Sequence, residues 1–235
     1  MKLAYWHFGK CAGQFLIAQF RQQGFEPLNS WVTGIERDWN EEECEFIADE
    51  EHFSPPLFVN HHLNLSESLL HRFKSRNWVT FGTYRDPRDI ICSLYFYGQK
   101  LIQEKRDSAG APFHSHGVLA GHLSKNLWEC PDVTKITLSE CIVQLVERPE
   151  LHRFWELPFY MKQLDYLIPA CENGFSRLFI DLGLSYHSAK RINVSGNEGF
   201  FTYEKILSDK ALSVIQASEK LQKSIRDFQD VSRSA

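Results

Sequence analysis

Residues 78–93 read WVTFGTYRDPRDIICS, and a strand pattern changes into a helix pattern within them. Trp78–Tyr84 is rich in the β-branched and aromatic residues that favour strands. Asp86 is a preferred N-cap residue and Pro87 suits the first helical position. A helix is therefore predicted to begin where the strand ends and to run to about Lys105. A strand that leads directly into a helix is typical of α/β proteins.

The same alternation recurs along the chain. Short apolar runs predict further strands at Leu3–Phe8, Leu57–His61 and Tyr166–Cys171. Helical spacing, capping residues and glycine stops predict helices over Ala12–Gln23, Ser66–Lys74, Thr137–Arg148, Pro158–Gln163, Phe175–Leu182 and Ser208–Gln229. The predicted fold class is α/β, a three-layer domain with a central, mostly parallel sheet flanked by helices.

Length and composition are those of an ordinary globular protein. The chain has 235 residues, of which 43% are hydrophobic and 24% charged, and this predicts a single domain over residues 1–235. Arg106–Ser124 is rich in Gly, Ser and His and is predicted to be a mobile loop. Ser232–Ala235 is expected to fray.

The charge is unevenly distributed. The net charge of −4 argues against a nucleic-acid partner. Residues 36–52 hold nine acidic residues and one arginine, which predicts a solvated acidic helical segment. The rest of the chain has a net charge of +4. Such a mildly basic body suits a small anionic ligand.

Cysteine and histidine spacing indicates neither disulfides nor a metal site. The six cysteines form no CxxC pair, which favours a reducing, cytoplasmic setting. His114, His116 and His122 lack the Cys or carboxylate partners of a metal centre. The apolar start of the chain is too short for a signal peptide, and no run of 18 apolar residues predicts a membrane span.

Residues 7–16, HFGKCAGQFL, predict an anion site. A strand runs into a turn of small residues that opens a helix, so backbone N–H groups and the positive helix end point at one place. Lys10 adds a positive charge. A Walker A loop would need Gly at Ala4 and Ser or Thr at Cys11. Cys11 offers no hydroxyl for Mg²⁺, so the anion is expected to bind without a metal.

A second anion site is predicted around Arg85 and Ser93. A guanidinium that ends a strand and a hydroxyl two turns into the next helix suit one phosphate group. The alternative is that Arg85 and Arg88 only pair with the neighbouring Asp86 and Asp89 as surface ion pairs.

These segments together resemble the sulfotransferase family that uses 3′-phosphoadenosine 5′-phosphosulfate. HFGKCAGQFL is similar to the family's 5′-phosphosulfate loop, and RDPRDIICS (residues 85–93) to its 3′-phosphate element. VNHHL (59–63) resembles the strand end that carries a catalytic His, without the Pro that follows in the family. FIDLGL (179–184) and RINVSG (191–196) resemble the family's last helix and closing phosphate loop.

The resemblance implies a P-loop-like sulfotransferase fold and transfer of a sulfuryl group to an acceptor hydroxyl or amine. It makes Lys10 and His62 the catalytic residues. The donor would be bound by Gly9, Lys10, Cys11, Ala12, Gly13, Gln14, Phe15, Arg85, Ser93 and Arg191. Gln14 replaces the family's usual hydroxyl residue. Phe15 would stack on adenine or belong to the core. The acceptor would be a small molecule or a glycan.

Two other function classes stay open. One is a nucleotide-dependent kinase of related fold, which Ala4 and Cys11 disfavour. The other is a non-catalytic nucleotide-binding or interaction module. If the protein is a sulfotransferase, His62 rather than His61 is the general base, because adjacent residues of a strand point to opposite faces.

Overall fold

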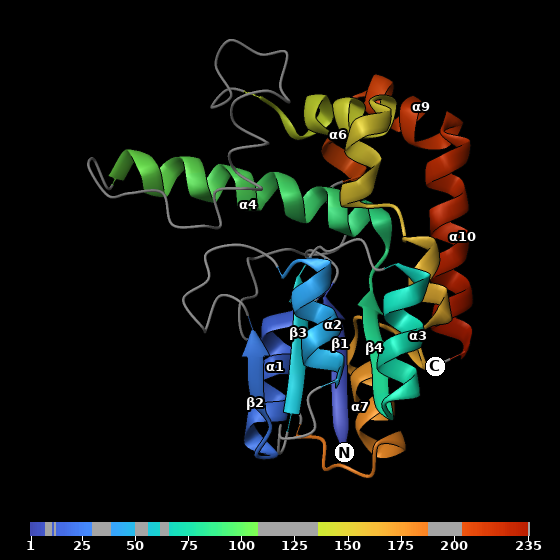
Figure 1. Ribbon diagram of the computed structural model, residues 1–235. Helices are drawn as coiled ribbons and strands as arrows, with labels where there is room; N and C mark the ends of the chain where they lie inside the picture. The colour runs from blue at the N-terminus through green and yellow to red at the C-terminus, as the bar shows by residue number, and fades with distance from the viewer. Residues whose placement is uncertain are drawn as a thin grey trace. The chain divides into compact units, whose positions relative to one another are not determined.

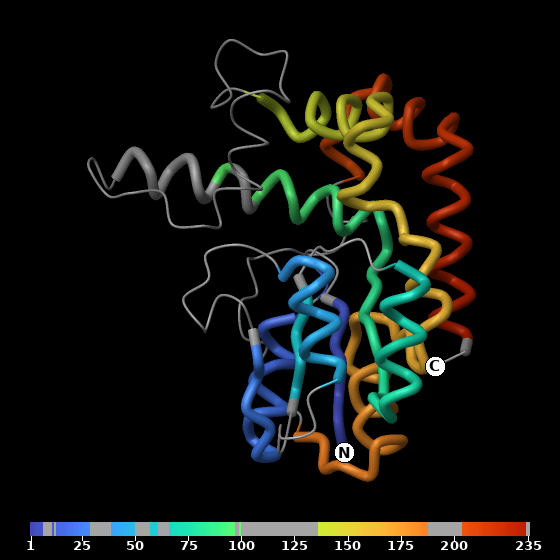
Figure 2. Tube along the Cα trace, in the orientation of Figure 1, coloured from blue at the N-terminus to red at the C-terminus, as the bar shows by residue number. Residues whose placement is uncertain are grey.

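The computed structural model describes residues 1–7, 11, 13–29, 39–49, 56–61, 66–107, 136–187 and 204–234, and the segments with uncertain placement are grey in Figure 2. The chain, for which one domain is predicted, divides into two compact units. The sheet unit comprises Met1–Arg85, Leu157–Asn193 and Asp227–Ala235. The helical unit comprises Asp86–Glu156 and Val194–Arg226.

The sheet unit is built on five strands that are all parallel. Their order in the sheet is β2-β3-β1-β4-β5. The strands are β1 (Lys2–His7), β2 (Glu26–Asn29), β3 (Pro56–His61), β4 (Trp78–Tyr84) and β5 (Tyr166–Pro169). This confirms the predicted α/β class and its parallel sheet. β2 is not predicted from the sequence, because its four residues, EPLN, include a proline and form no apolar run.

Helices cover both faces of this sheet (Figure 1). α1 (Gly13–Gln22) and α7 (Glu172–Asp181) lie on one face, and α2 (Glu41–Asp49) and α3 (Glu67–Ser75) on the other. A short 3₁₀ helix, Phe159–Gln163, takes the place of the helix predicted before β5. Right-handed crossovers explain why α1 lies on the face opposite α2 and α3: the connection from β1 to β2 runs toward one edge of the sheet, whereas those from β2 to β3 and from β3 to β4 run toward the other.

Local signals in the sequence account for the helix ends. α1 stops before Gly24, whose φ of +82° is strained for residues with a side chain. Ser66 caps α3 by accepting a hydrogen bond from the Leu69 N–H. Asn40 caps α2 within a reciprocal capping box with Glu43, and this box starts the acidic helix inside the predicted segment 36–52.

The core on the α1 side combines aromatic and aliphatic side chains between the helices and the sheet. Phe20 of α1 stacks on Phe179 of α7 at 4.7 Å between ring centroids and packs at a tilt against Phe81 of β4 at 5.3 Å. All three side chains are fully buried. Gly174 lets α7 approach β5 closely, since a Cβ there would lie 2.3 Å from the Pro169 carbonyl oxygen.

A second aromatic cluster fills the α2 side. Phe58 of β3 packs against Trp6 of β1 and Phe73 of α3, with centroid distances of 6.1 and 5.2 Å, and Trp6 and Phe73 also contact each other at 5.1 Å. Trp39, just before α2, packs against the same Phe58 ring at 6.4 Å. Pairs of this kind add about 0.5–1.5 kcal/mol each beyond the burial of their surface. The two clusters therefore pack helices against both faces of the sheet.

The helical unit begins at the predicted strand-to-helix junction. Its elements are α4 (Pro87–Asp107), α6 (Leu138–Glu147), two 3₁₀ helices (Pro149–Phe154 and Glu204–Ile206), α9 (Asp209–Ala217) and α10 (Glu219–Ser234), whose last turns belong to the sheet unit. The Asp86 carboxylate accepts from the Arg88 N–H and caps α4, as predicted. Thr137 and Glu140 form the predicted capping box of α6.

Three predictions need correction here. The single helix predicted over Ser208–Gln229 is two helices, because Ser218 ends α9 and its hydroxyl caps α10 by accepting from the Leu221 N–H. α10 continues to Ser234, so most of the expected frayed tail is helical. The loop predicted over Arg106–Ser124 begins later, because α4 continues through Arg106 to Asp107. The rest of that predicted loop, 108–124, lies outside the described residues. Among the helices that the structure describes, none has the length and apolar character needed to cross a membrane.

Candidate functional site

The ends of three neighbouring strands form the carboxyl edge of the sheet. In the ladder, His7 of β1 is level with His61 of β3 on one side and with Thr83 of β4 on the other. Neighbouring strands lie about 4.8 Å apart, so the three ends span about 10 Å. Three of the segments that carry the family resemblance, 7–16, 59–63 and 85–93, lie at or directly after the ends of these strands.

The strand order places a switch point between β1 and β4. β1 is followed by β2, which lies on the β3 side, whereas β4 is followed in the sheet by β5 on the opposite side. The connections diverge, and open α/β sheets bind ligands outside the carboxyl ends of strands at such a point. The turn after β1 and Arg85 after β4 border it.

Two buried hydrogen bonds through the Thr83 hydroxyl connect the turn after β1 to β4. Thr83 Oγ1 donates to the Cys11 carbonyl oxygen at 2.8 Å, and Thr83 itself is fully buried. Because that hydroxyl has one proton, Tyr5, whose oxygen lies 2.8 Å from Thr83 Oγ1, is the donor to it. Burial raises the pKa of the Tyr5 hydroxyl far above its ordinary value, so Tyr5 stays protonated and keeps donating.

The predicted phosphosulfate loop is described in part. Cys11 is fully buried, and Gly13 is the first residue of α1. The helix therefore starts at the carboxyl edge, where its N-terminal N–H groups favour anions. Gln14 is exposed in the first turn. Gly9, Lys10 and Ala12 lie outside the described residues.

Phe15 has a core position. It is 6% exposed and its ring lies 5.2 Å from that of Phe175 of α7, within the apolar cluster of the α1 side. This favours the core interpretation of Phe15 over adenine stacking.

The two arginines after β4 differ. Arg88 forms a bidentate ion pair with Asp86, with distances of 2.9 Å from Nε to Oδ1 and 2.6 Å from Nη2 to Oδ2. Arg88 thus pairs with Asp86, as the ion-pair alternative predicts, although the pair is largely buried rather than on the surface. Arg85 is half-buried at the end of the sheet unit, next to the switch point.

The remaining predicted residues are distributed as follows. Ser93 is 3% exposed and lies in α4, in the helical unit. His62 and Arg191 lie outside the described residues, and β3 ends at His61. The choice between His61 and His62 stays a prediction.

Asn60 is a candidate residue that sequence reasoning missed. It is 1% exposed at the end of β3, level with Trp6 of β1. Neither its Nδ2 nor its Oδ1 has a hydrogen-bond partner among the described residues. Buried polar groups without a partner are rare in folded proteins, and a catalytic or binding role is one reason for them. The signal in the sequence is a carboxamide in the otherwise apolar strand PLFVNH.

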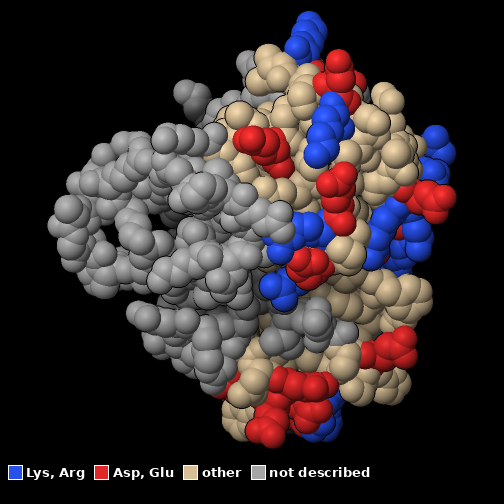
Figure 3. Space-filling model, turned by 90° about the horizontal axis from the view of Figure 1, so that it is seen from above, with Lys and Arg blue, Asp and Glu red and all other residues tan. Residues whose placement is uncertain are grey.

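The face seen in Figure 3 carries charges of both signs, and the described residues form no group of metal ligands. Basic and acidic side chains are interspersed on the surface seen from above (Figure 3). In the part of the chain that the structure describes, no three His, Cys, Asp or Glu side chains are grouped to hold a metal ion.

The structure is that of an α/β protein with a five-stranded, all-parallel sheet flanked by helices. Comparisons of the chain with protein-family models, with curated proteins and with solved structures found no match.

Proposed function

We propose that the protein is a cytoplasmic sulfotransferase with a P-loop-like sulfotransferase fold. Its donor is 3′-phosphoadenosine 5′-phosphosulfate, and its acceptor is a hydroxyl or amine of a small molecule or glycan. One observation supports this most. Three of the segments that carry the resemblance, 7–16, 59–63 and 85–93, lie at or directly after the ends of three adjacent parallel strands that are level in the ladder. Because every strand of a parallel sheet ends at this edge, the support comes from the fact that the three segments belong to adjacent strands.

The order of the strands adds a second argument. The donor's two charged ends need two anion sites close together. The turn that opens α1 and the segment starting at Arg85 border the same switch point between β1 and β4. The Thr83–Cys11 hydrogen bond connects the turn after β1 to β4, the strand that leads to Arg85.

The proposed reaction is a direct transfer. The acceptor's oxygen or nitrogen attacks the sulfur atom, and the bond from sulfur to the bridging oxygen of the 5′-phosphate breaks. The products are the sulfated acceptor and adenosine 3′,5′-bisphosphate. Lys10 and the N–H groups of the turn stabilise the charge that grows on the leaving phosphate oxygen. His62 takes the acceptor's proton, since a neutral imidazole can accept one near pH 7.

Asn60 is assigned a positioning role in this reaction. Its buried amide offers two donors and an acceptor two residues before His62 and has no partner among the described residues. A polar group of the acceptor or donor would satisfy it. No divalent metal is needed, because the transferred group carries less charge than a phosphoryl group.

A screen with donor labelled in its sulfuryl group tests the function. The protein is incubated with pools of phenols, alcohols, amines and glycans in the presence of EDTA, and transfer of the label to an acceptor is measured. We expect transfer for at least one pool. Complete absence of transfer over all pools, together with phosphoryl transfer from ATP and Mg²⁺, would establish the kinase instead.

Replacement of each histidine separates their roles. His62→Asn should lower turnover about 10²–10⁴-fold, the usual contribution of a positioned base, while the product nucleotide still binds. His61→Asn should have a small effect. The reverse result would make His61 the base, and full activity of both variants would remove His62 from the mechanism.

A further inference from the structure

Tyr84 is the last residue of β4, and it places Arg85 at the carboxyl edge of the sheet. The Tyr84 backbone is paired with Pro169 of β5, and its carbonyl oxygen accepts a 2.7 Å hydrogen bond from the Ala170 N–H. Its side chain is fully buried, although the strand ends there. Because Arg85 is bonded directly to Tyr84, contacts that hold the Tyr84 ring also hold the backbone from which the Arg85 guanidinium extends.

The Phe228 ring of α10 packs against the Tyr84 ring. The ring centroids lie 6.3 Å apart, and the ring planes meet at 67°, an edge-to-face arrangement. This geometry is favourable for aromatic pairs. Phe228 is half-buried and lies in the last turns of α10, which belong to the sheet unit. Tyr84 is therefore held by its ring as well as by its backbone.

An ion pair fastens the same turn of α10 to the 3₁₀ helix Phe159–Gln163. Lys162 Nζ lies 2.6 Å from Asp227 Oδ1. Met161, the neighbour of Lys162 in that helix, is 1% exposed and packs over Gly82 of β4. Gly82 lies two positions before the end of the strand, and alternate residues of a strand share a face. The 3₁₀ helix and the end of α10 thus support the same face of β4.

Thr83 holds the opposite face of the strand end. Its side chain points away from that of Tyr84, because adjacent residues of a strand alternate between the two faces. Its hydroxyl donates to the Cys11 carbonyl oxygen. The strand end before Arg85 is therefore fixed from both faces, by the turn after β1 on one side and by Phe228 on the other.

We propose that Phe228 is a positioning residue for donor binding. Its ring holds Tyr84 and thereby sets the direction in which Arg85 reaches the 3′-phosphate of the donor. This inference rests on the proposed sulfotransferase function, in which Arg85 binds that phosphate. Asp227 supports Phe228 through its pair with Lys162. Without the ring, the guanidinium keeps its charge but loses its orientation, so donor affinity falls in part.

Calorimetry with adenosine 3′,5′-bisphosphate in EDTA, at a temperature where every variant is folded, tests this proposal. Phe228→Ala should weaken binding about tenfold, within the range for residues that act on a site through packed neighbours. Phe228→Tyr keeps the ring and should bind as the unchanged protein does. In the Arg85→Ala background, Phe228→Ala should have little further effect, because both changes act on one guanidinium. Full affinity of Phe228→Ala, or additive losses in the double variant, would overturn the proposal.

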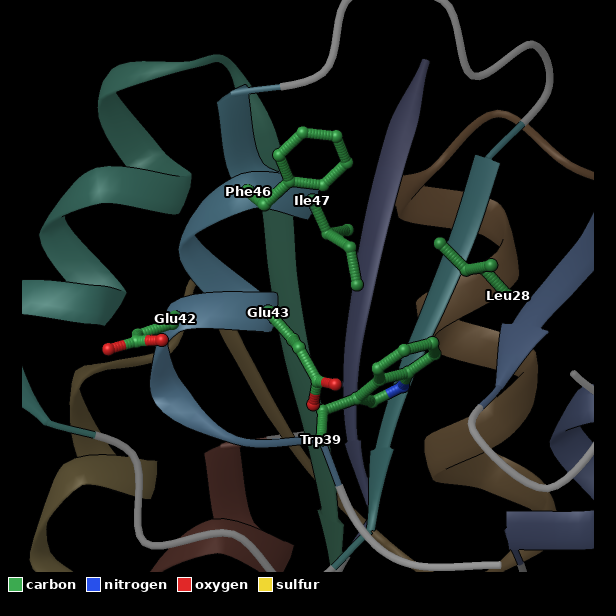
Figure 4. A pocket seen from close by; sticks show the side chains of 6 residues that line it. All are labelled: Leu28, Trp39, Glu42, Glu43, Phe46 and Ile47. Carbon is green, nitrogen blue, oxygen red and sulfur yellow. The ribbon is translucent and has the colours of Figure 1, made fainter. Parts of the chain in front are cut away.

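Ile47→Ala is the matched control for a loss of stability alone. Ile47 is 4% exposed in α2 and lines an apolar pocket beside β2 (Figure 4). In the sheet, β3 and β1 lie between β2 and β4. This variant should lower the melting temperature and leave the affinity for the bisphosphate unchanged. An affinity loss as large as that of Phe228→Ala would reduce the effect of Phe228 to general stability and refute its positioning role.

Hydrogen exchange tests the positioning role without any ligand. The Ala170 N–H, which donates to the Tyr84 carbonyl oxygen, should exchange faster in Phe228→Ala than in Ile47→Ala or Phe228→Tyr. Equal exchange in all three variants would contradict the proposal even if the donor binds. If the unchanged protein does not bind the bisphosphate, the proposed function itself fails, and the inference fails with it. If the unchanged protein binds it and Phe228→Ala binds equally well, only the inference fails.

Discussion

Thr83 Oγ1 donates a 2.8 Å hydrogen bond to the carbonyl oxygen of Cys11, across 72 positions in the chain. The bond fastens the turn after β1 to the end of β4. Both segments carry charged or helix-terminal groups suited to an anion. We regard this bond as important for the proposed donor site, because it connects the two segments directly and in addition to the ladder.

Removal of the Thr83 hydroxyl should therefore lower both stability and donor affinity. Thr83→Val deletes the bonds to Cys11 and Tyr5 in a buried place, which costs about 1–3 kcal/mol of the free energy of unfolding. Tyr5→Phe leaves the Thr83–Cys11 bond in place and should cost less, with donor affinity unchanged. Urea unfolding and calorimetry with adenosine 3′,5′-bisphosphate measure the two effects. Equal losses of affinity in both variants would show that the Cys11 bond is not what matters.

The arginines after β4 should behave differently when each is replaced. Arg85→Ala should weaken adenosine 3′,5′-bisphosphate by about 1.5–3 kcal/mol, the value of a hydrogen bond to a charged group. Arg88→Ala breaks the ion pair with Asp86 and should lower stability while affinity stays the same. Calorimetry gives the affinities and thermal unfolding the stabilities. If Arg88→Ala were the variant that loses affinity, the 3′-phosphate assignment would move to Arg88.

Asn60→Leu should separate stability from activity. Two buried polar atoms without a partner each cost about 1–3 kcal/mol, so an apolar side chain of similar size should keep or raise the melting temperature. Turnover should fall, because the amide is assigned to positioning. A variant that is more stable and fully active would show that the Asn60 amide contributes to neither stability nor turnover.

The acid stability of the sheet unit should depend on Asp165. Burial alone would raise the pKa of this carboxyl, but hydrogen bonds from Lys74 and from the Thr80 N–H and hydroxyl outweigh it, and the pKa lies below its ordinary value of 3.8. A carboxyl with a lowered pKa in the folded state stabilises the fold above its ordinary pKa. That stabilisation is lost as the pH falls through the folded-state pKa.

Asp165→Asn should thus lower the free energy of unfolding at pH 7 by about 1 kcal/mol, a value reduced by the solvent exposure of the Lys74 pair. The gap to the original protein should shrink below pH 4. Urea titrations at several pH values measure it, with the exposed Glu147→Gln as control. A gap independent of pH would mean that the carboxyl charge contributes nothing.

Local signals made much of the fold predictable. Asp86-Pro87 and the Thr137–Glu140 box each determine a helix start within a few residues, because capping is a matter of neighbouring groups. β2 and the break at Ser218 were missed. β2 is a strand only because β3 pairs with it, and Ser218 interrupts a continuous helical pattern.

The site was predictable only in its parts. The turn after β1 and the arginine after β4 are visible as sequence motifs, whereas the Thr83–Cys11 bond joins residues far apart in the chain. The unpartnered amide of Asn60 depends on what surrounds it in three dimensions. The sequence indicates that Arg88 can pair with a neighbouring aspartate, but only the side-chain geometry identifies Asp86 as its partner.

Calorimetric titration of the purified protein with adenosine 3′,5′-bisphosphate in EDTA, beside a titration with ATP and Mg²⁺, tests the central claim most directly. The account predicts one-to-one binding of the bisphosphate without metal, weakened by Arg85→Ala, and much weaker binding of ATP with Mg²⁺. Binding of ATP that requires Mg²⁺ and no binding of the bisphosphate would contradict it.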